Sequence, residues 1–316
     1  MKRGKLITTM LMAVSSLTLS SPGAVAQEPQ VPVASFKASV DLVRLSAVVR
    51  DKKGRFVRDL TARDFEVLDG GQRRRISDFR RDQSGVSIAL LFDVSGSMEA
   101  LLTPAREAAM HLISWLDARD EAAVFAFDSS LEEVAPFTKG MQELPPRMAA
   151  MTAFGATSLH DAIAQTAERL EIRDSTRRAV VVFTDGRDTS SRLTPSQVSG
   201  IASAIDVPVY ILGIVPNIDN PFADIGTVTA QQSALSGPLA NLAHWTGGET
   251  FIVSRPAERS LVARQIVDEL RQQYLIAFEA SGTPGWRPLT VRARDKDHIV
   301  RARSGYIAGQ SRPISH

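Results

Sequence analysis

Two short runs of almost uninterrupted apolar residues constrain the fold of this chain more than any other feature. They occupy residues 86–92 and 179–183. A strand that is apolar at nearly every position must be buried on both faces, as happens in a parallel sheet covered by helices on both sides. The sequence therefore predicts an α/β core and not a sheet with one face open to water.

Helical spacing of apolar residues follows the first of these runs and precedes the second. Apolar side chains recur every three to four residues over 101–116 and 159–170, as the buried face of a helix requires. Thr194 followed by Pro195 and Gln197 is typical of a helix start, with a capping residue, a first-turn proline and a capping-box partner. Strand and helix patterns alternate in this way from residue 86 to residue 272, which predicts a doubly wound, mostly parallel sheet.

Two segments with a period of two flank the alternating region. Residues 36–82 and 273–308 contain strands with alternating apolar and polar positions, separated by turn residues. Neither segment is long enough to build a stable core alone. We expect them to pack together as one small discontinuous antiparallel β-sandwich domain. The α/β domain of residues 86–255 is then inserted between them, and a helix over 256–272 leads into the second segment.

The first 26 residues have the order of features found in a secretory signal peptide. A basic head precedes an apolar run over 6–19, which is too short to span a bilayer, and Ala24-Val25-Ala26 places small residues at a cleavage site. An uncleaved N-terminal anchor is the alternative. After a flexible lead-in over 27–35, no stretch is long and apolar enough for a membrane span. We expect an exported protein, periplasmic or extracellular.

Composition excludes several kinds of partner and chemistry. The chain has 37 Lys and Arg against 35 Asp and Glu, and the expected signal peptide contains basic residues but no acidic ones. The mature chain is therefore close to neutral, which gives no support for nucleic-acid binding. The absence of cysteine excludes disulfides, thiolate-bound metals and thiol nucleophiles.

Oxygen-bearing side chains follow both apolar runs and also occupy a loop between them. Asp93, Ser95 and Ser97 come directly after the first run, and Asp185 comes after the second. Thr157 lies in the loop that leads into a helix. Because the carboxyl ends of parallel strands meet at one edge of a sheet, we expect these five side chains to lie together. Carboxylates and hydroxyls without thiolates are ligands for hard cations such as Mg²⁺, Mn²⁺ or Ca²⁺.

The same residues carry a resemblance to a known family. Asp93-x-Ser95-x-Ser97, together with Thr157 and Asp185, resembles the metal-ion-dependent adhesion site of von Willebrand factor type A domains. The likeness covers the whole predicted α/β domain. It implies that the two serines coordinate Mg²⁺ directly, that the threonine and the aspartates act directly or through water, and that a partner's carboxylate completes the metal shell.

The flanking segments resemble those of a secreted bacterial subgroup of the same family. Asp69-Gly70 with residues 76–79 lies before the α/β domain, and residues 300–306 lie after it. The resemblance as a whole implies a binding module for a protein partner that offers an acidic side chain, and not an enzyme.

Simpler interpretations stay open for several of these residues. Ser97 can cap the helix that follows it, and Asp185 can be only a turn residue. For Asp161 we favour a capping box with Thr157 or Ser158 over a role beside the metal.

Other polar residues are expected to be structural. Asp188 is expected to be solvated or to stabilise its loop, and the scattered histidines to be structural or surface residues. The polar residues over 217–224 fit an irregular loop better than a second calcium site. The Arg73-Arg74-Arg75 run fits a solvated edge strand better than a site for an anionic partner.

A metal-dependent hydrolase or phosphoryl-transfer enzyme is the alternative class of function, because oxygen ligands at strand ends also serve such reactions. The sequence has no G-x-S-x-G elbow, no G-x-x-x-x-G-K-[ST] loop and no G-x-G-x-x-G. We therefore expect binding without catalysis.

Overall fold

The computed structural model describes residues 42–81, 84–173, 175, 177–204, 206–216, 233, 235–280 and 284–309. The expected signal peptide, the lead-in and the polar residues over 217–224 lie outside these ranges. Within them, no helix combines the length and the apolar character that crossing a membrane requires.

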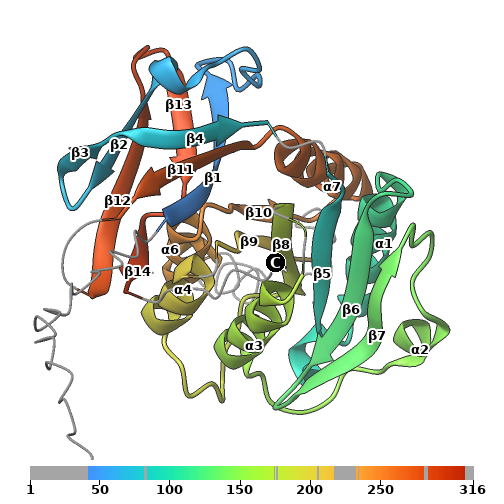
Figure 1. Cartoon of the computed structure of the whole chain (residues 1–316). Coiled ribbons are helices and arrows are strands. Elements are labelled where there is room, and N and C mark those ends of the chain that lie inside the picture. The colour runs from blue at the N-terminus through green and yellow to red at the C-terminus, as the bar shows by residue number, and fades with distance from the viewer. Residues whose placement is uncertain are drawn as a thin grey trace, which may run out of the picture. The chain divides into compact units, whose positions relative to one another are not determined.

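A six-stranded sheet forms the centre of the α/β domain in the described part of the chain (Figure 1). Its order is β10-β9-β8-β5-β6-β7, with β7 antiparallel to β6 and the other neighbours parallel. The central strands β5 and β8 contain the two apolar runs and are buried at every position. The strands are β5 (Val86–Asp93), β6 (Glu121–Phe127), β7 (Leu131–Lys139), β8 (Arg177–Thr184), β9 (Val209–Ile214) and β10 (Thr250–Val253).

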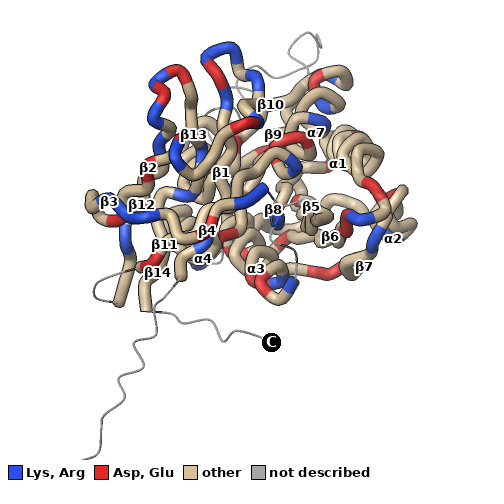
Figure 2. The backbone as a smooth tube through the Cα atoms, turned by 45° about the horizontal axis from the view of Figure 1, so that its top comes forward, with Lys and Arg blue, Asp and Glu red and all other residues tan. Residues whose placement is uncertain are grey.

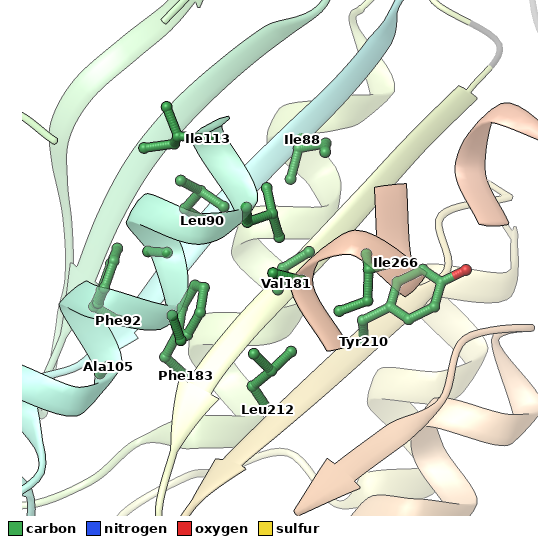
Figure 3. Close-up of a cluster of buried hydrophobic side chains, with 14 of the residues drawn as sticks. Ile88, Leu90, Phe92, Ala105, Ile113, Val181, Phe183, Tyr210, Leu212 and Ile266 are labelled. Atoms are coloured by element: carbon green, nitrogen blue, oxygen red, sulfur yellow. The ribbon is translucent and has the colours of Figure 1, made fainter. Parts of the chain in front are cut away.

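Helices cover both faces of this sheet because its strands have no polar face. The first core cluster joins α1 and α7 to one face, and the second joins α3, α4 and α6 to the other. Figure 3 shows the first cluster, in which Phe92 of β5 and Phe183 of β8 stack at 4.7 Å between ring centroids. The helices are α1 (Leu102–Ser114), α2 (Pro146–Ala150), α3 (Leu159–Glu171), α4 (Pro195–Ala204), α6 (Pro238–Trp245) and α7 (Pro256–Arg271), with short 3-10 turns η1 (Ala62–Asp64) and η2 (Gly96–Met98).

Two antiparallel sheets form the β-sandwich domain among the described residues. Their orders are β13-β1-β11-β4 and β14-β12-β2-β3. Leu45 of β1 lies opposite Ile276 of β11, and Val67 of β2 lies opposite Val291 of β12. Each sheet therefore combines strands from the segment before the α/β domain with strands from the segment after it. The strands are β1 (Leu42–Asp51), β2 (Phe65–Asp69), β3 (Gln72–Arg74), β4 (Ile76–Arg80), β11 (Tyr274–Glu279), β12 (Gly285–Ala293), β13 (His298–Ala302) and β14 (Gly305–Ala308).

Buried ion pairs join the sandwich to the α/β domain. Glu269 of α7 is fully buried and accepts hydrogen bonds from Arg50 of β1 at 2.7 Å and from the Tyr210 hydroxyl of β9 at 3.0 Å. Its carboxylate also pairs with Arg301 of β13. Arg303 donates to main-chain carbonyls at the end of α4. The end of α7 is thus held by strands of both domains.

The basic run after β2 lies on an edge strand, β3. Arg73 pairs with Glu66, and Arg74 pairs with Asp69 at 2.9 Å. Figure 2 shows these basic positions on β3 among acidic positions of the same domain. Paired charges on an exposed edge discourage pairing with another chain, which is the role expected from the sequence.

The predicted fold class is confirmed: a doubly wound, mostly parallel sheet is inserted into a discontinuous antiparallel β-sandwich. The sequence analysis missed β14 and α2. Both are five residues or shorter, so neither completes enough periods to stand out from a loop.

Candidate functional site

The five predicted site residues come from three loops at the carboxyl ends of the central strands. β5 ends at Asp93, and η2 follows with Ser97 inside it. Asp185 comes directly after β8, and Thr157 stands two residues before α3. Four of the five side chains are buried and Ser97 is half-buried.

Asp93 is the most constrained member of the set. It is fully buried, and its Oδ1 accepts a hydrogen bond from the Ser95 N–H at 3.0 Å. Its Oδ2 accepts one from the Thr184 hydroxyl at 2.6 Å. The first bond closes a tight turn within the loop, and the second ties the ends of β5 and β8 together. The carboxylate is therefore held in one orientation.

The two serines lie side by side. Their hydroxyl oxygens are 3.3 Å apart. Adjacent ligands of one octahedral ion with bonds of about 2.1 Å stand about 3 Å apart, so this spacing suits neighbouring positions on one cation. The α-helix after the loop begins at Leu102, and no side-chain capping bond forms there or at η2. The interpretation of Ser97 as a helix cap is therefore wrong.

Hydrogen bonds between main-chain groups connect the three loops. The Gly96 N–H donates to the Gly155 carbonyl at 3.1 Å, which joins the first loop to the second. The Thr157 carbonyl accepts from Thr189 at 2.9 Å and from Ser190 at 3.0 Å, which joins the second loop to the third. Gly155 has a φ of +87°, a conformation that only glycine adopts readily. The three loops that carry the five side chains are thus held together by main-chain hydrogen bonds.

Asp185 is fully buried beside an arginine. Its Oδ1 accepts a hydrogen bond from the Arg187 N–H at 3.1 Å, and the guanidinium Nε lies 3.6 Å from Oδ2. Gly186 between them has a φ of +87°, and a Cβ there would lie 2.8 Å from Leu235. The turn after β8 consequently needs glycine at this position.

Burial dominates the electrostatic environment of Asp93. Burial, with a smaller contribution from the negative charge of Asp185, raises the pKa of Asp93 to about 6, although hydrogen bonds from Ser95 and Thr184 act to lower it. A carboxylate pair at this depth is costly in charged form unless a cation compensates it. Among the described residues, no group of three His, Cys, Asp or Glu side chains is placed to hold a metal. The five candidate residues supply two carboxylates and three hydroxyls.

Asp161 does not have the role that we favoured for it. Its carboxylate accepts hydrogen bonds from the N–H groups of Arg192, at 3.1 Å, and Leu193, at 2.9 Å, in the loop after β8, and α3 has no side-chain capping bond at Ser158. The capping-box prediction failed because a contact with a distant loop replaced the local one. Thr194 and Gln197, by contrast, form the predicted capping box, with bonds of 2.9 and 3.4 Å.

Asp188 stabilises its loop, as expected. It accepts hydrogen bonds from the N–H groups of Ser190 at 3.3 Å and Ser191 at 3.0 Å, and pairs with His160 of α3. The sequence analysis missed Thr184 and Thr189, which hold the site residues. Thr184 could have been found, since parallel β5 and β8 with matching apolar runs place it beside Asp93.

These observations define a doubly wound α/β domain. At the carboxyl ends of its central strands β5 and β8, two buried carboxylates and several hydroxyl groups come from neighbouring loops. The family model of the von Willebrand factor type A domain matches residues 88–187. Residues 88–187 thus match a von Willebrand factor type A domain.

Three solved structures illustrate what this chain is similar to. A von Willebrand factor type A protein from Catenulispora acidiphila has 14% identity and a TM-score of 0.44, covering 86% of this chain and 73% of that one. The conserved hypothetical protein BatB from Bacteroides thetaiotaomicron has 16% identity and a TM-score of 0.44, covering 58% and 98%.

The third is proximal thread matrix protein 1 from the mussel byssus, with a zinc-occupied MIDAS motif. It has 15% identity and a TM-score of 0.44, covering 65% of this chain and 50% of that one. A comparison with curated proteins found no match.

Proposed function

We propose that this protein is an exported binding module that captures a protein partner through a divalent metal ion. Asp93, Ser95, Ser97, Thr157 and Asp185 would hold the ion. The observation that carries the proposal is the set of hydrogen bonds that locks three loops together and gathers five oxygen-bearing side chains at one sheet edge. Mg²⁺ is the ion that we favour, with Mn²⁺ and Ca²⁺ as alternatives.

The residues present fit such an ion. All five donors are oxygen atoms, and the spacing of the two serine hydroxyls suits adjacent positions on one cation. Both oxygens of Asp93 already accept protein hydrogen bonds, so this residue is suited to act through a water molecule. An ion bound mainly by hydroxyls and water keeps much of its positive charge, and when bound it offers a position for one more anionic oxygen.

A Glu or Asp side chain of a partner protein has the chemistry to fill that position. Specificity then depends on the rim of the site. Phe154 lies one residue before Gly155, and 80% of its surface is exposed. Its N–H donates to the Val94 carbonyl at 2.8 Å, which fixes the backbone that carries the ring beside the first loop. An exposed aromatic ring on a rigid loop is typical of an interface anchor.

A titration of the metal tests the proposal. Isothermal titration calorimetry with Mg²⁺ should show one binding event in wild type and none in Asp93→Ala. Glu99→Ala is a matched control, because Glu99 is an exposed carboxylate next to the same loop. Equal Mg²⁺ affinity in wild type and Asp93→Ala would refute the site.

Two further measurements test the rest of the proposal. Capture of partners from the native envelope fraction should depend on Mg²⁺ and be lost in EDTA. Turnover of esters or phosphates that disappears in Asp93→Ala would instead favour the hydrolase alternative.

A further inference from the structure

A second candidate site lies between the two domains. It is a pocket of about 350 Å³ next to α4 and the end of α6 on one side and to β12 and β14 on the other, elements that lie together in Figure 1. No residue of the candidate metal site lines it. In the part of the chain that the structure describes, its lining residues are Ser196, Ser199, Gly200, Trp245, Trp286 and Ser304.

The lining combines aromatic surface with neutral polar groups. Trp245 and Trp286 remain 36% and 49% exposed, although tryptophan is usually buried. Ser199 also lines the pocket and is only 4% exposed. A serine hydroxyl can donate and accept a hydrogen bond, so Ser199 gives the pocket wall a group that a neutral polar ligand can contact.

The pocket is held in shape by contacts that cross between the domains. The Trp245 carbonyl accepts hydrogen bonds from the Ser304 N–H at 2.9 Å and the Ser304 hydroxyl at 3.2 Å. Trp286 packs against Gly305 so closely that a Cβ there would lie 2.2 Å from the indole. A Cβ on Gly200 would meet nothing within 4 Å, so the pocket is open above α4. Two rigid indoles thus border an open space.

We propose that this pocket binds a neutral carbohydrate, one or two sugar rings of a glycan. A sugar ring presents an apolar C–H face that stacks on an indole, and hydroxyls that exchange hydrogen bonds with Ser199 and the indole N–H groups. None of the six lining residues within the described ranges is charged, which disfavours phosphate and carboxylate ligands. The volume lies at the small end of the range for small-molecule sites. A proline-rich peptide also packs on tryptophan, but it needs an extended groove and not a compact pocket.

Tryptophan fluorescence measures the binding directly, because the chain has three tryptophans and two of them line the pocket. The third, Trp115, is replaced by Phe so that only the pocket is observed. The protein is titrated with chitotriose, cellotriose, maltotriose and mannotriose, and with a decaproline peptide. We expect a saturable change in emission with at least one trisaccharide and none with decaproline.

Variants then locate the binding. Trp286→Ala should weaken it about tenfold, and Ser199→Ala, which loses one neutral hydrogen bond, about fivefold. Gly200→Leu adds a side chain to the open space of the pocket within a helix, so it should abolish binding while the melting temperature stays the same or rises. This variant keeps the test valid if Trp286→Ala folds poorly.

The proposal is independent of the metal. Binding should persist in EDTA and in Asp93→Ala, so failure of the metal site leaves it intact. It is overturned if no trisaccharide gives a saturable change up to ~10 mM, a concentration that detects even weak sites. It is also overturned if decaproline binds in their place, or if Gly200→Leu binds the sugar as well as wild type does.

Discussion

Asp93 has a structural role in addition to its proposed role in metal binding. Its two carboxylate oxygens close the loop after β5 and fasten β5 to β8. Those bonds hold the group in place, but burial raises its pKa to about 6. Near neutral pH the folded chain therefore keeps a buried negative charge that a cation would stabilise.

This charge predicts a pH dependence of stability in the metal-free protein. A carboxyl whose pKa is raised by folding contributes stability that is fully present below its unfolded pKa and lost as the pH rises through the folded value. Relative to Asp93→Asn, wild type in EDTA should lose about 1 kcal/mol of unfolding free energy between pH ~5 and pH ~7.5. Urea denaturation at both pH values measures the difference.

Metal binding should depend on pH in the opposite direction to the stability of the metal-free protein. Protonation of Asp93 removes the negative charge that favours the ion, so Mg²⁺ affinity should fall as the pH drops below about 6. A Mg²⁺ affinity that does not change across this range would contradict the assignment of Asp93.

Phe154 is the residue on which partner specificity should depend. Its ring is 80% exposed, so Phe154→Ala should change the unfolding free energy by less than about 0.5 kcal/mol. The same change should weaken partner capture by about 2 kcal/mol, as loss of an aromatic anchor does. Calorimetry with Mg²⁺ and pull-down from the envelope fraction separate the two. Phe154→Tyr, which keeps the aromatic surface, is the control.

At the scale of elements, loops and helix ends are fixed by particular polar side chains. Glu258 in the first turn of α7 accepts hydrogen bonds from the N–H groups of Ser254 at 3.0 Å and Arg255 at 3.1 Å. These bonds and the Arg255 guanidinium lower the pKa of Glu258 to about 2. The negative charge also lies at the positive end of the helix dipole. The start of α7 is thus defined by one carboxylate.

Glu258→Gln should therefore destabilise the protein at neutral pH. Gln keeps an acceptor oxygen but loses the negative charge, which contributes up to about 1 kcal/mol at a helix N-terminus. Because the pKa is depressed on folding, the contribution is present above the unfolded value of 4.5 and is lost as the pH falls toward 2. Urea denaturation near pH 7 and near pH 3 should show the difference between wild type and variant shrinking at the lower pH. A difference that grows on acidification would contradict this assignment.

At the scale of the described molecule, the sandwich and the α/β domain share a buried ionic contact. Glu269 at the end of α7 receives Arg50 and Arg301 from the sandwich and Tyr210 from the central sheet. Figure 3 shows the Tyr210 hydroxyl directed away from the apolar cluster that surrounds its ring. Such a network costs desolvation, and removing one partner leaves the others uncompensated.

Glu269→Gln should destabilise the protein by about 3 kcal/mol, since it leaves two arginines without their shared carboxylate. Chemical denaturation measures this loss. Asp268→Asn is the matched control, because its side chain is 44% exposed and pairs only along the helix with Arg264 among the described residues. A loss below about 0.5 kcal/mol for Glu269→Gln would show that the two domains do not depend on this contact.

Much of this architecture could be predicted from the sequence. The runs over 86–92 and 179–183 required a sheet buried on both faces, since no polar position was left for water. The alternation of apolar and polar residues in the two flanking segments predicted a second sheet structure, with one face of each sheet buried and the other exposed to water. The position of oxygen side chains after the apolar strands indicated one cluster, because parallel strands end at a common edge. These inferences rest on patterns that are local in the chain.

Other features depended on the tertiary structure. Asp161 bonds to a loop thirty residues away instead of capping its own helix, and Thr184 orients Asp93 across two strands. The ionic contact of Glu269 joins it to Arg50, 219 residues earlier in the chain, and the pocket between Trp245 and Trp286 brings together residues of the two domains. No periodicity records such pairs, because the free energy of a polar contact depends on which groups meet in a buried space and not on their spacing in sequence.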